Sequence, residues 1–96
     1  MAAYSLSAKA AEELERIYEY SVLTFGLSQA RSYLNGLHQL FQTLADNPML
    51  GRSAERLAPE MRRIEYKSHS IFYRNENRHA LIVRVLHQTM DVDRHL

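Results

Sequence analysis

The C-terminal half of the chain carries two runs of apolar and β-branched residues with a short polar segment between them. The runs cover residues 69–74 and 80–87, and the segment 75–79 is rich in asparagine. Ile, Val, Phe and Tyr favour a pleated surface, and two such runs joined by a polar loop are typical of a β-hairpin. Both faces of the runs are largely apolar, so we expect this hairpin at the centre of a sheet.

Regular alternation along each strand predicts which side chains of the hairpin share a face. In the second run it groups Leu81, Val83, Val85 and His87 on one face, opposite Ile82, Arg84 and Leu86. In the first run it places Ile71 and Tyr73 opposite Ser70, Phe72 and Arg74. Charged residues are rarely buried without a partner, so the arginines and histidines of the hairpin indicate either a ligand face or internal ion pairs.

Two amphipathic helices are predicted before the hairpin. A short strand at residues 4–6 leads to Ser7 in an N-cap position, and Gly26 stops the first helix. Ser28 is the expected cap of the second helix, which Asn47-Pro48 ends. The apolar stripes at helical spacing are Ala10, Leu14, Ile17, Tyr18, Ser21, Val22 and Phe25, then Ala30, Tyr33, Leu34, Leu37, Phe41, Leu44 and Ala45. We interpret Gly36 as a point where the two helices approach closely.

A further strand is predicted at residues 61–67, after a connection punctuated by Gly51 and Pro59. Its alternation places Arg62, Ile64 and Tyr66 on one face and Arg63, Glu65 and Lys67 on the other. Lys67-Ser68 is expected to form a tight turn into the hairpin. Residues 88–96 are read as a short polar turn or tail. The order β-α-α-β-β-β predicts one α+β domain over residues 1–96, with a helical hairpin packed on a mostly antiparallel sheet.

Composition narrows the class of protein. The 96 residues include no cysteine, which excludes a disulfide framework and a thiolate metal site. No apolar run approaches the roughly 20 residues that span a bilayer, and the first residues lack the pattern of a secretory signal. We therefore expect a cytoplasmic protein without membrane contact.

The net charge of +1 is unevenly distributed. Residues 1–48 hold three Lys/Arg and five Asp/Glu, whereas residues 49–96 hold nine and six. The sheet half is thus mildly basic, which suits an acidic partner, although charge alone favours a solvated basic edge.

Several short motifs stand in a characteristic order along nearly the whole chain. They are Tyr4-Ser-Leu-Ser7 before an Ala/Glu-rich helix, Leu44-Ala-Asp-Asn-Pro48, Leu50-Gly-Arg52, Met61-Arg62-Arg63, Ser68-His-Ser-Ile-Phe-Tyr-Arg74, Ile82-Val-Arg-Val-Leu-His87, Met90-Asp91 and Arg94-His95-Leu96. In this order and spacing the chain resembles the ParE toxins of type II toxin–antitoxin pairs, within the RelE/ParE superfamily. The fold of that superfamily agrees with the predicted element order.

The resemblance implies a function by binding, without a cofactor. ParE toxins poison DNA gyrase, and a ParD-like antitoxin neutralises them; operator DNA is reached only through the antitoxin. Acidic side chains of the antitoxin would meet the basic sheet edge, where the candidate contacts are Arg62, Arg63, Tyr66, Arg74 and Arg84. The candidate gyrase contacts lie in the polar C-terminal stretch and are His87, Met90, Asp91, Arg94 and His95.

Two other functions stay open. RelE-like relatives cut mRNA on the ribosome, which requires a base, an acid and cations for the phosphate. Arg62, Arg84 and His87 could supply these, with Lys67 or Tyr73, although the chain lacks the C-terminal tyrosine and added lysines typical of RelE-like nucleases. Equally, Arg84 could pair with a glutamate, His87 could cap the strand end and Tyr73 could pack. The third function is a non-toxic module that only binds an antitoxin.

A metal site built from His69, His87 and Asp91 has no recognised ligand spacing. We therefore expect no metal in this protein.

Overall fold

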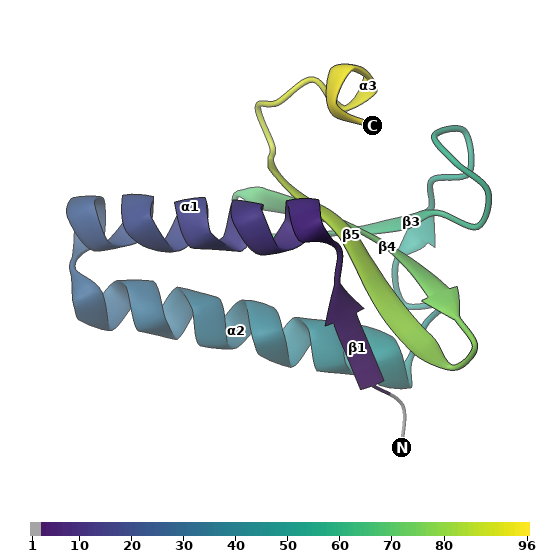
Figure 1. Ribbon diagram of the computed structural model, residues 1–96, viewed down its shortest axis with the longest axis horizontal. Helices are drawn as coiled ribbons and strands as arrows, with labels where there is room; N and C mark the ends of the chain where they lie inside the picture. The colour runs from purple at the N-terminus through teal and green to yellow at the C-terminus, as the bar shows by residue number, and fades with distance from the viewer. Residues whose placement is uncertain (1–2) are drawn as a thin grey trace.

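The computed structural model describes residues 3–96 and shows two layers, with a pair of helices packed on one face of a five-stranded sheet (Figure 1). The elements are β1 (Ala3–Leu6), α1 (Ala8–Phe25), α2 (Leu27–Asp46), β2 (Arg52–Ser53), β3 (Arg62–Tyr66), β4 (His69–Glu76), β5 (His79–His87) and α3 (Val92–His95). The predicted α+β class and its element order are confirmed. The short elements β2 and α3 were not predicted. None of the helices in residues 3–96 is both long and apolar enough to cross a membrane.

The sheet has the order β1-β5-β4-β3-β2, so the predicted hairpin of β4 and β5 is central as expected. β1 runs parallel to β5, and the other neighbours are antiparallel. The hairpin loop is shorter than predicted, because Glu76 already pairs with His79. Asn77 and Arg78 form the turn with φ of 51° and 62°, the left-handed pair that two-residue hairpin turns require.

A β-bulge in β5 changes which side chains share a face. Phe72 pairs with Arg84 whereas Tyr73 pairs with Ile82, so Val83 is an extra residue on β5. As a result, Ile82 and Val85 both lie in the core beneath the helices. Val83 and Leu86 contribute to a second cluster. The prediction that Val83 shares a face with Val85, and Ile82 with Leu86, is therefore wrong.

The main core lies between the helical hairpin and the sheet. Its fully buried residues come from α1, α2, β4 and β5, and they are Ala10, Leu37, Phe41, Leu44, Ile71, Tyr73 and Ile82. Tyr4 and Leu6 of β1 pack against this cluster together, as the alternation predicted. A smaller cluster, Ala54, Met61, Phe72 and Leu86, covers the other face beneath the 54–61 loop and Val92 of α3.

The helix ends follow the predictions only in part. Ser7 caps α1 as expected, because its hydroxyl accepts a hydrogen bond from the Ala10 amide at 3.0 Å. Gly26, with φ of 94°, ends α1 and begins α2 without a side-chain cap, so the predicted cap at Ser28 is wrong. Phe25, placed in the buried stripe, is 60% exposed. The tip of the helical hairpin extends beyond the sheet, which leaves that end of the stripe uncovered (Figure 1).

Gly36 makes room for the sheet and not for the other helix. A Cβ at this position would lie 1.9 Å from the Tyr66 hydroxyl oxygen and 3.0 Å from its Cζ atom. The interpretation that Gly36 brings the two helices together is therefore wrong. The glycine is needed because the ring of Tyr66, on β3, sits directly against the backbone of α2.

Candidate functional site

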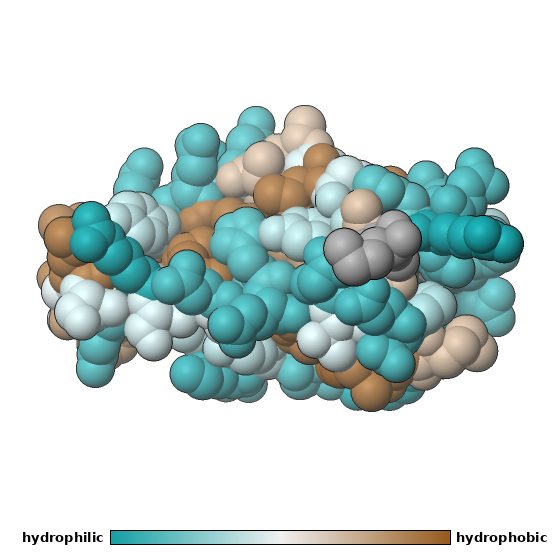
Figure 2. Space-filling view, turned by 90° about the horizontal axis from the view of Figure 1, so that it is seen from below, coloured by the Kyte–Doolittle hydropathy of each residue, from teal (hydrophilic) through white to brown (hydrophobic). Residues whose placement is uncertain are grey.

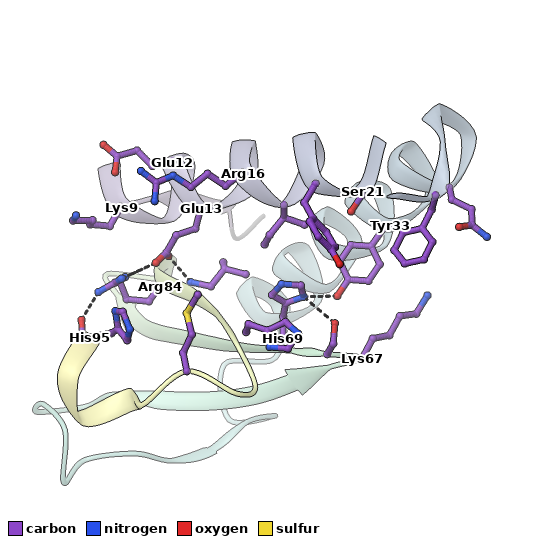
Figure 3. Close-up of a pocket in the computed structure, with 18 of the residues that line it drawn as sticks. Lys9, Glu12, Glu13, Arg16, Ser21, Tyr33, Lys67, His69, Arg84 and His95 are labelled. Carbon is purple, nitrogen blue, oxygen red and sulfur yellow. Dashed lines mark hydrogen bonds and ion pairs between the residues drawn. The ribbon is translucent and has the colours of Figure 1, made fainter. Parts of the chain in front are cut away.

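A groove lies between the inner face of α1, the start of α2 and the end of the sheet formed by the β3–β4 turn and the last residues of β5 (Figure 3). Its volume of about 1060 Å³ lies at the upper end of the roughly 300–1,000 Å³ of small-molecule pockets, which suits a peptide segment. Apolar and aromatic side chains supply much of its wall, among them Ile17, Tyr20, Phe25, Tyr33, Val85 and Met90.

The groove is basic. Four Lys/Arg side chains line it, Lys9, Arg16, Lys67 and Arg84, against two carboxylates, Glu12 and Glu13, for a charge of +2 before the histidines are counted. Complementary charge guides and selects a partner more than it adds affinity. The groove therefore favours an acidic segment that also carries apolar side chains.

One side of the groove is closed by an ion pair between Glu13 of α1 and Arg84 of β5. The Nε and Nη2 atoms of Arg84 donate to Glu13 Oε2 at 2.9 and 2.6 Å, and the two side chains are only 16% and 14% exposed for Glu13 and Arg84. Glu13 Oε1 accepts the backbone amide of Val85 at 2.8 Å, just after the bulge. Arg84 also donates to the backbone carbonyl of His95. Of the two sequence interpretations of Arg84, the structure shows the ion pair with a glutamate.

A histidine pair forms the floor of the groove. His69 and His87 face each other across β4 and β5, with ring centroids 5.4 Å apart. The Tyr33 hydroxyl lies 2.6 Å from His69 Nδ1, and His87 Nδ1 accepts the Thr89 amide at 3.2 Å. Burial lowers the pKa of His69, and the neighbouring His87 lowers it further. Burial raises the pKa of Tyr33, so its hydroxyl stays protonated at neutral pH.

Of the five predicted antitoxin contacts, only Arg84 lines this groove. Arg62 donates to the Gly51 carbonyl at 2.9 Å, and Arg74 pairs with Glu76 at 2.9 Å. Tyr66 packs edge-on against Tyr33 with centroids 5.4 Å apart, and it borders a second, shallower hollow beside Gly36.

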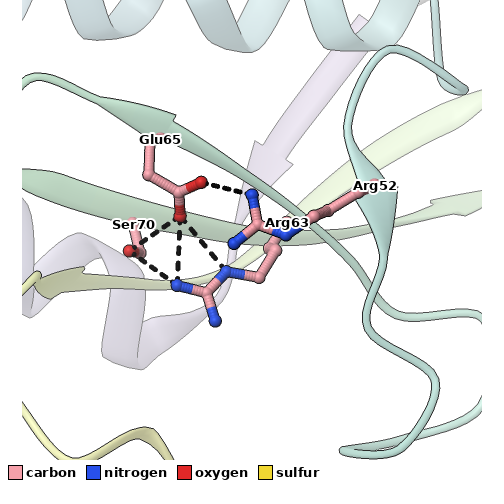
Figure 4. Close-up of polar contacts among 4 residues, drawn as sticks. All are labelled: Arg52, Arg63, Glu65 and Ser70. Atoms are coloured by element: carbon pink, nitrogen blue, oxygen red, sulfur yellow. Dashed lines mark hydrogen bonds and ion pairs between the residues drawn. The ribbon is translucent and has the colours of Figure 1, made fainter.

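Arg63 belongs to a polar cluster on β3 and its neighbours (Figure 4). The Glu65 carboxylate there accepts Arg52 at 2.6 Å, Arg63 at 3.0 Å and the Ser70 hydroxyl at 3.1 Å. Burial alone would raise the pKa of Glu65, but the hydrogen bonds from Arg52, Arg63 and Ser70 together lower it. Arg52 and Arg63 are therefore both paired with a carboxylate of the same chain.

The predicted gyrase contacts lie in a stretch that is folded against the body of the protein. His87, Met90 and His95 line one end of the groove. Asp91 caps α3 by accepting the amide of Asp93. Arg94 is exposed and has no ion-pair partner within residues 3–96. The tail expected from the sequence is therefore a short helix with defined contacts.

Of the residues nominated for a nuclease, Lys67, Arg84 and His87 line the groove, whereas Arg62 and Tyr73 do not. Arg62 is aligned across the sheet with Tyr73, whereas His87 is aligned with His69 and, through it, with Tyr66. Arg62 and Tyr66 are four residues apart on β3, which is roughly 13 Å along a strand. Within the described part of the chain, no group of three or more His, Asp or Glu side chains could hold a metal ion.

The tip of the helical hairpin is a second feature that sequence reasoning missed. Figure 2 shows apolar side chains gathered at this end of the molecule, and the exposed large ones are Tyr20, Leu23, Phe25 and Leu27, at 65, 87, 60 and 47%. Residues 20–30 contain no charged side chain, which is the signal that could have revealed this surface. Tyr20 and Phe25 also line the groove, so the apolar tip continues it. Contiguous exposed apolar surface commonly marks an interaction site.

Comparison with known proteins identifies the family. Residues 4–92 match the sequence model of the family described as "ParE toxin of type II toxin-antitoxin system, parDE". Toxin ParE1 of Mycobacterium tuberculosis strain H37Rv is 39% identical over 94 residues, which cover 97% of this chain and 96% of that toxin. Toxin ParE1 of Caulobacter vibrioides is 38% identical over 96 residues, covering 100% and 99%.

A solved structure supports the fold. A chain of the "Chromosomal ParDE TA system from P. aeruginosa" superposes with a TM-score of 0.74 at 23% identity, over 91% of this chain and 95% of that one. The two chains therefore share one fold. The chain belongs to the ParE toxin family of type II toxin–antitoxin systems.

Proposed function

We propose that this ParE-family toxin poisons DNA gyrase and that a ParD-like antitoxin neutralises it by laying an acidic, amphipathic segment in the groove. Membership of the family over nearly the full chain is the observation that carries the proposal. The groove supports it, because four basic side chains and an apolar wall suit a segment that folds on binding. The exposed apolar tip at Leu23 and Phe25 extends the same surface.

The toxin acts by binding and not by catalysis. A nuclease would need Arg62, Arg84 and His87 around one phosphate, whereas Arg62 is held at Gly51 and Arg84 is held by Glu13. The separation of Arg62 from Arg84 and His87, which share the groove, supports gyrase inhibition over mRNA cleavage.

The gyrase contact is proposed to include the C-terminal stretch, where Met90 and Arg94 are exposed. Arg94 makes no ion pair within residues 3–96. Met90→Ala with Arg94→Ala should reduce gyrase inhibition without changing the melting temperature. Arg31→Ala, an exposed cation on α2, is the matched control. Removal of residues 90–96 is a less selective test, because it also strips Val92 from the second cluster. Full inhibition by the folded double variant would contradict this contact surface.

Expression in a bacterial host tests the proposal against its alternatives. The proposal predicts growth arrest with DNA damage and intact mRNA, relieved by co-expression of the cognate ParD-like antitoxin. Unimpeded growth at confirmed expression would indicate a non-toxic antitoxin-binding module. Arrest with cleaved mRNA and undamaged DNA would indicate a RelE-like nuclease.

A further inference from the structure

The Nδ1 atom of each histidine at the floor of the groove is engaged within the chain. A backbone N–H can only donate, so the hydrogen bond from the Thr89 amide makes Nδ1 of His87 an acceptor, and the Thr89 hydroxyl lies 2.8 Å from the same atom. The Tyr33 hydroxyl lies 2.6 Å from His69 Nδ1 and also contacts the Tyr66 carbonyl at 3.4 Å. Once a ring is protonated, its Nε2 carries a hydrogen whichever tautomer the neutral ring adopts.

The two Nε2 atoms are available to a ligand. Neither Nε2 atom has a hydrogen-bond partner within residues 3–96. In that part of the chain, Arg74 Nε is the one fully buried side-chain nitrogen or oxygen left without a partner. The Nε2 atoms of His69 and His87 therefore reach solvent, and both rings line the groove.

Neither histidine forms an ion pair with a carboxylate among residues 3–96. The titratable or charged groups that line the groove with the pair are Lys9, Glu12, Glu13, Arg16, Tyr20, Tyr33, Lys67, Arg84 and His95. Glu13 is held by Arg84 and the Val85 amide. Lys67 lies over the rings of Tyr33 and Tyr66 at 5.5 and 5.4 Å and has no carboxylate partner in the described chain.

We propose that His69 and His87 form a seat for a carboxylate of the bound segment, with the Lys67 ammonium at its rim. This inference rests on the proposed function, since the ligand is an acidic side chain of the ParD-like antitoxin. Two N–H donors on one face of the sheet match the two oxygens of a carboxylate, and the Lys67 ammonium in the same groove adds charge complementarity. The seat gives the bound segment a specific polar contact beside the apolar part of the wall.

Occupation of the seat is linked to protonation. In the free toxin, burial and mutual repulsion keep the pKa of His69 below its ordinary value, so this ring is neutral at neutral pH. A carboxylate placed against the rings favours their charged form and raises that pKa. Binding therefore takes up protons, and the affinity for the antitoxin increases as the pH falls.

Calorimetry of the full-length toxin with the cognate ParD-like antitoxin, in buffers of different ionisation enthalpy, measures this linkage. We expect proton uptake on binding near neutral pH and several-fold tighter binding at about pH 6 than at about pH 8, because a one-unit rise in pKa gives at most ~tenfold and reaches that factor only well below both pKa values. The double variant His69→Gln/His87→Gln should lose the proton uptake. His79→Gln, at the far end of β5 and outside the groove, should keep it.

An independent arm uses sodium acetate as the carboxylate probe on isotopically labelled free toxin. The imidazole NMR signals of His69 and His87 should shift with acetate and not with sodium chloride, and the shift should be larger at the lower pH. The signal of His79 should not respond. Because this titration uses the unmodified toxin, it tests the carboxylate seat even if the glutamine variants fold poorly.

The outcomes separate the two proposals. Antitoxin binding that is independent of pH and takes up no proton would overturn the carboxylate seat and leave the proposed function intact. If the antitoxin does not bind at any pH, the proposed function fails, and the acetate titration alone then decides the seat. Imidazole signals that respond equally to acetate and chloride would overturn it.

Discussion

The ion pair of Glu13 and Arg84 should be worth more to stability than any other charged contact in the protein. The perturbation we consider is Glu13→Ala. It leaves the Arg84 guanidinium with only the His95 carbonyl, and it leaves the Val85 amide without its acceptor at the bulge. The other four ion pairs have at least one partner that is 40% or more exposed.

The magnitude follows from burial. Removing one partner of a buried ion pair costs roughly 3–5 kcal/mol, and an exposed pair contributes about 0–1 kcal/mol. Because Glu13 is 16% exposed at the edge of a groove, we expect about 2–4 kcal/mol for Glu13→Ala. Arg84→Met should cost less, about 1–3 kcal/mol, since the Glu13 carboxylate keeps the Val85 amide.

Chemical denaturation with thermal melting measures both changes. For a domain of this size 1 kcal/mol corresponds to roughly 4–8 °C in Tm, so Glu13→Ala should lower Tm by roughly 8 °C or more. Glu12→Ala is the matched control, because Glu12 is its exposed neighbour on α1 and has no ion pair among the described residues. If Glu13→Ala and Glu12→Ala have the same midpoint, the argument from burial is refuted.

Three further predictions concern the core, one glycine and one histidine. Leu37→Ala should destabilise by roughly 2–5 kcal/mol, since Leu37 is fully buried, whereas Leu23→Ala at 87% exposure should leave the denaturation midpoint unchanged. Gly36→Ala should destabilise despite a helix-propensity gain of about 1 kcal/mol, and adding Tyr66→Phe should restore part of the loss; a Gly36→Ala protein more stable than wild type would contradict the close contact. The pKa of His69 is lowered in the folded state, so below about pH 6.5 the unfolded chain binds a proton at this residue more readily than the folded protein does. The free energy of unfolding should therefore fall as the pH drops below about 6.5. His69→Gln should flatten this slope in melts recorded across that range, and an unchanged slope would assign it to other groups.

Most of the fold could be predicted because its signals are local. The apolar spacing of α1 and α2, the cap at Ser7 and the β-branched runs of β4 and β5 each lie within a few residues of the structure they specify. The features that were missed depend on distant parts of the chain. At the bulge, the Ser7 hydroxyl donates to the Val83 carbonyl at 2.6 Å and Glu13 accepts the Val85 amide, both from the other end of the chain. The space above Gly36 is filled by Tyr66.

The candidate site was less predictable than the fold. The charge distribution favoured arginines of the sheet half as antitoxin contacts. In the structure Arg62 donates to the Gly51 carbonyl, and Arg63 and Arg74 pair with Glu65 and Glu76 of the same chain. The groove is also lined by Lys9 and Arg16 of α1, two residues that the sequence analysis did not single out. No sequence period tells which face of a helix will border a groove. The predicted contact residues that do line it are Arg84, His87, Met90 and His95, together with Lys67 from the nuclease alternative.

A supercoiling and cleavage assay with purified toxin, DNA gyrase, relaxed plasmid and ATP tests the central claim most directly. The proposed function predicts lost supercoiling and trapped, cleaved plasmid, both prevented by prior addition of the ParD-like antitoxin. Ribosome-bound mRNA incubated in parallel should stay intact. Normal supercoiling at saturating toxin, together with cut mRNA, would contradict gyrase poisoning and return this ParE-family chain to the nuclease branch of its superfamily.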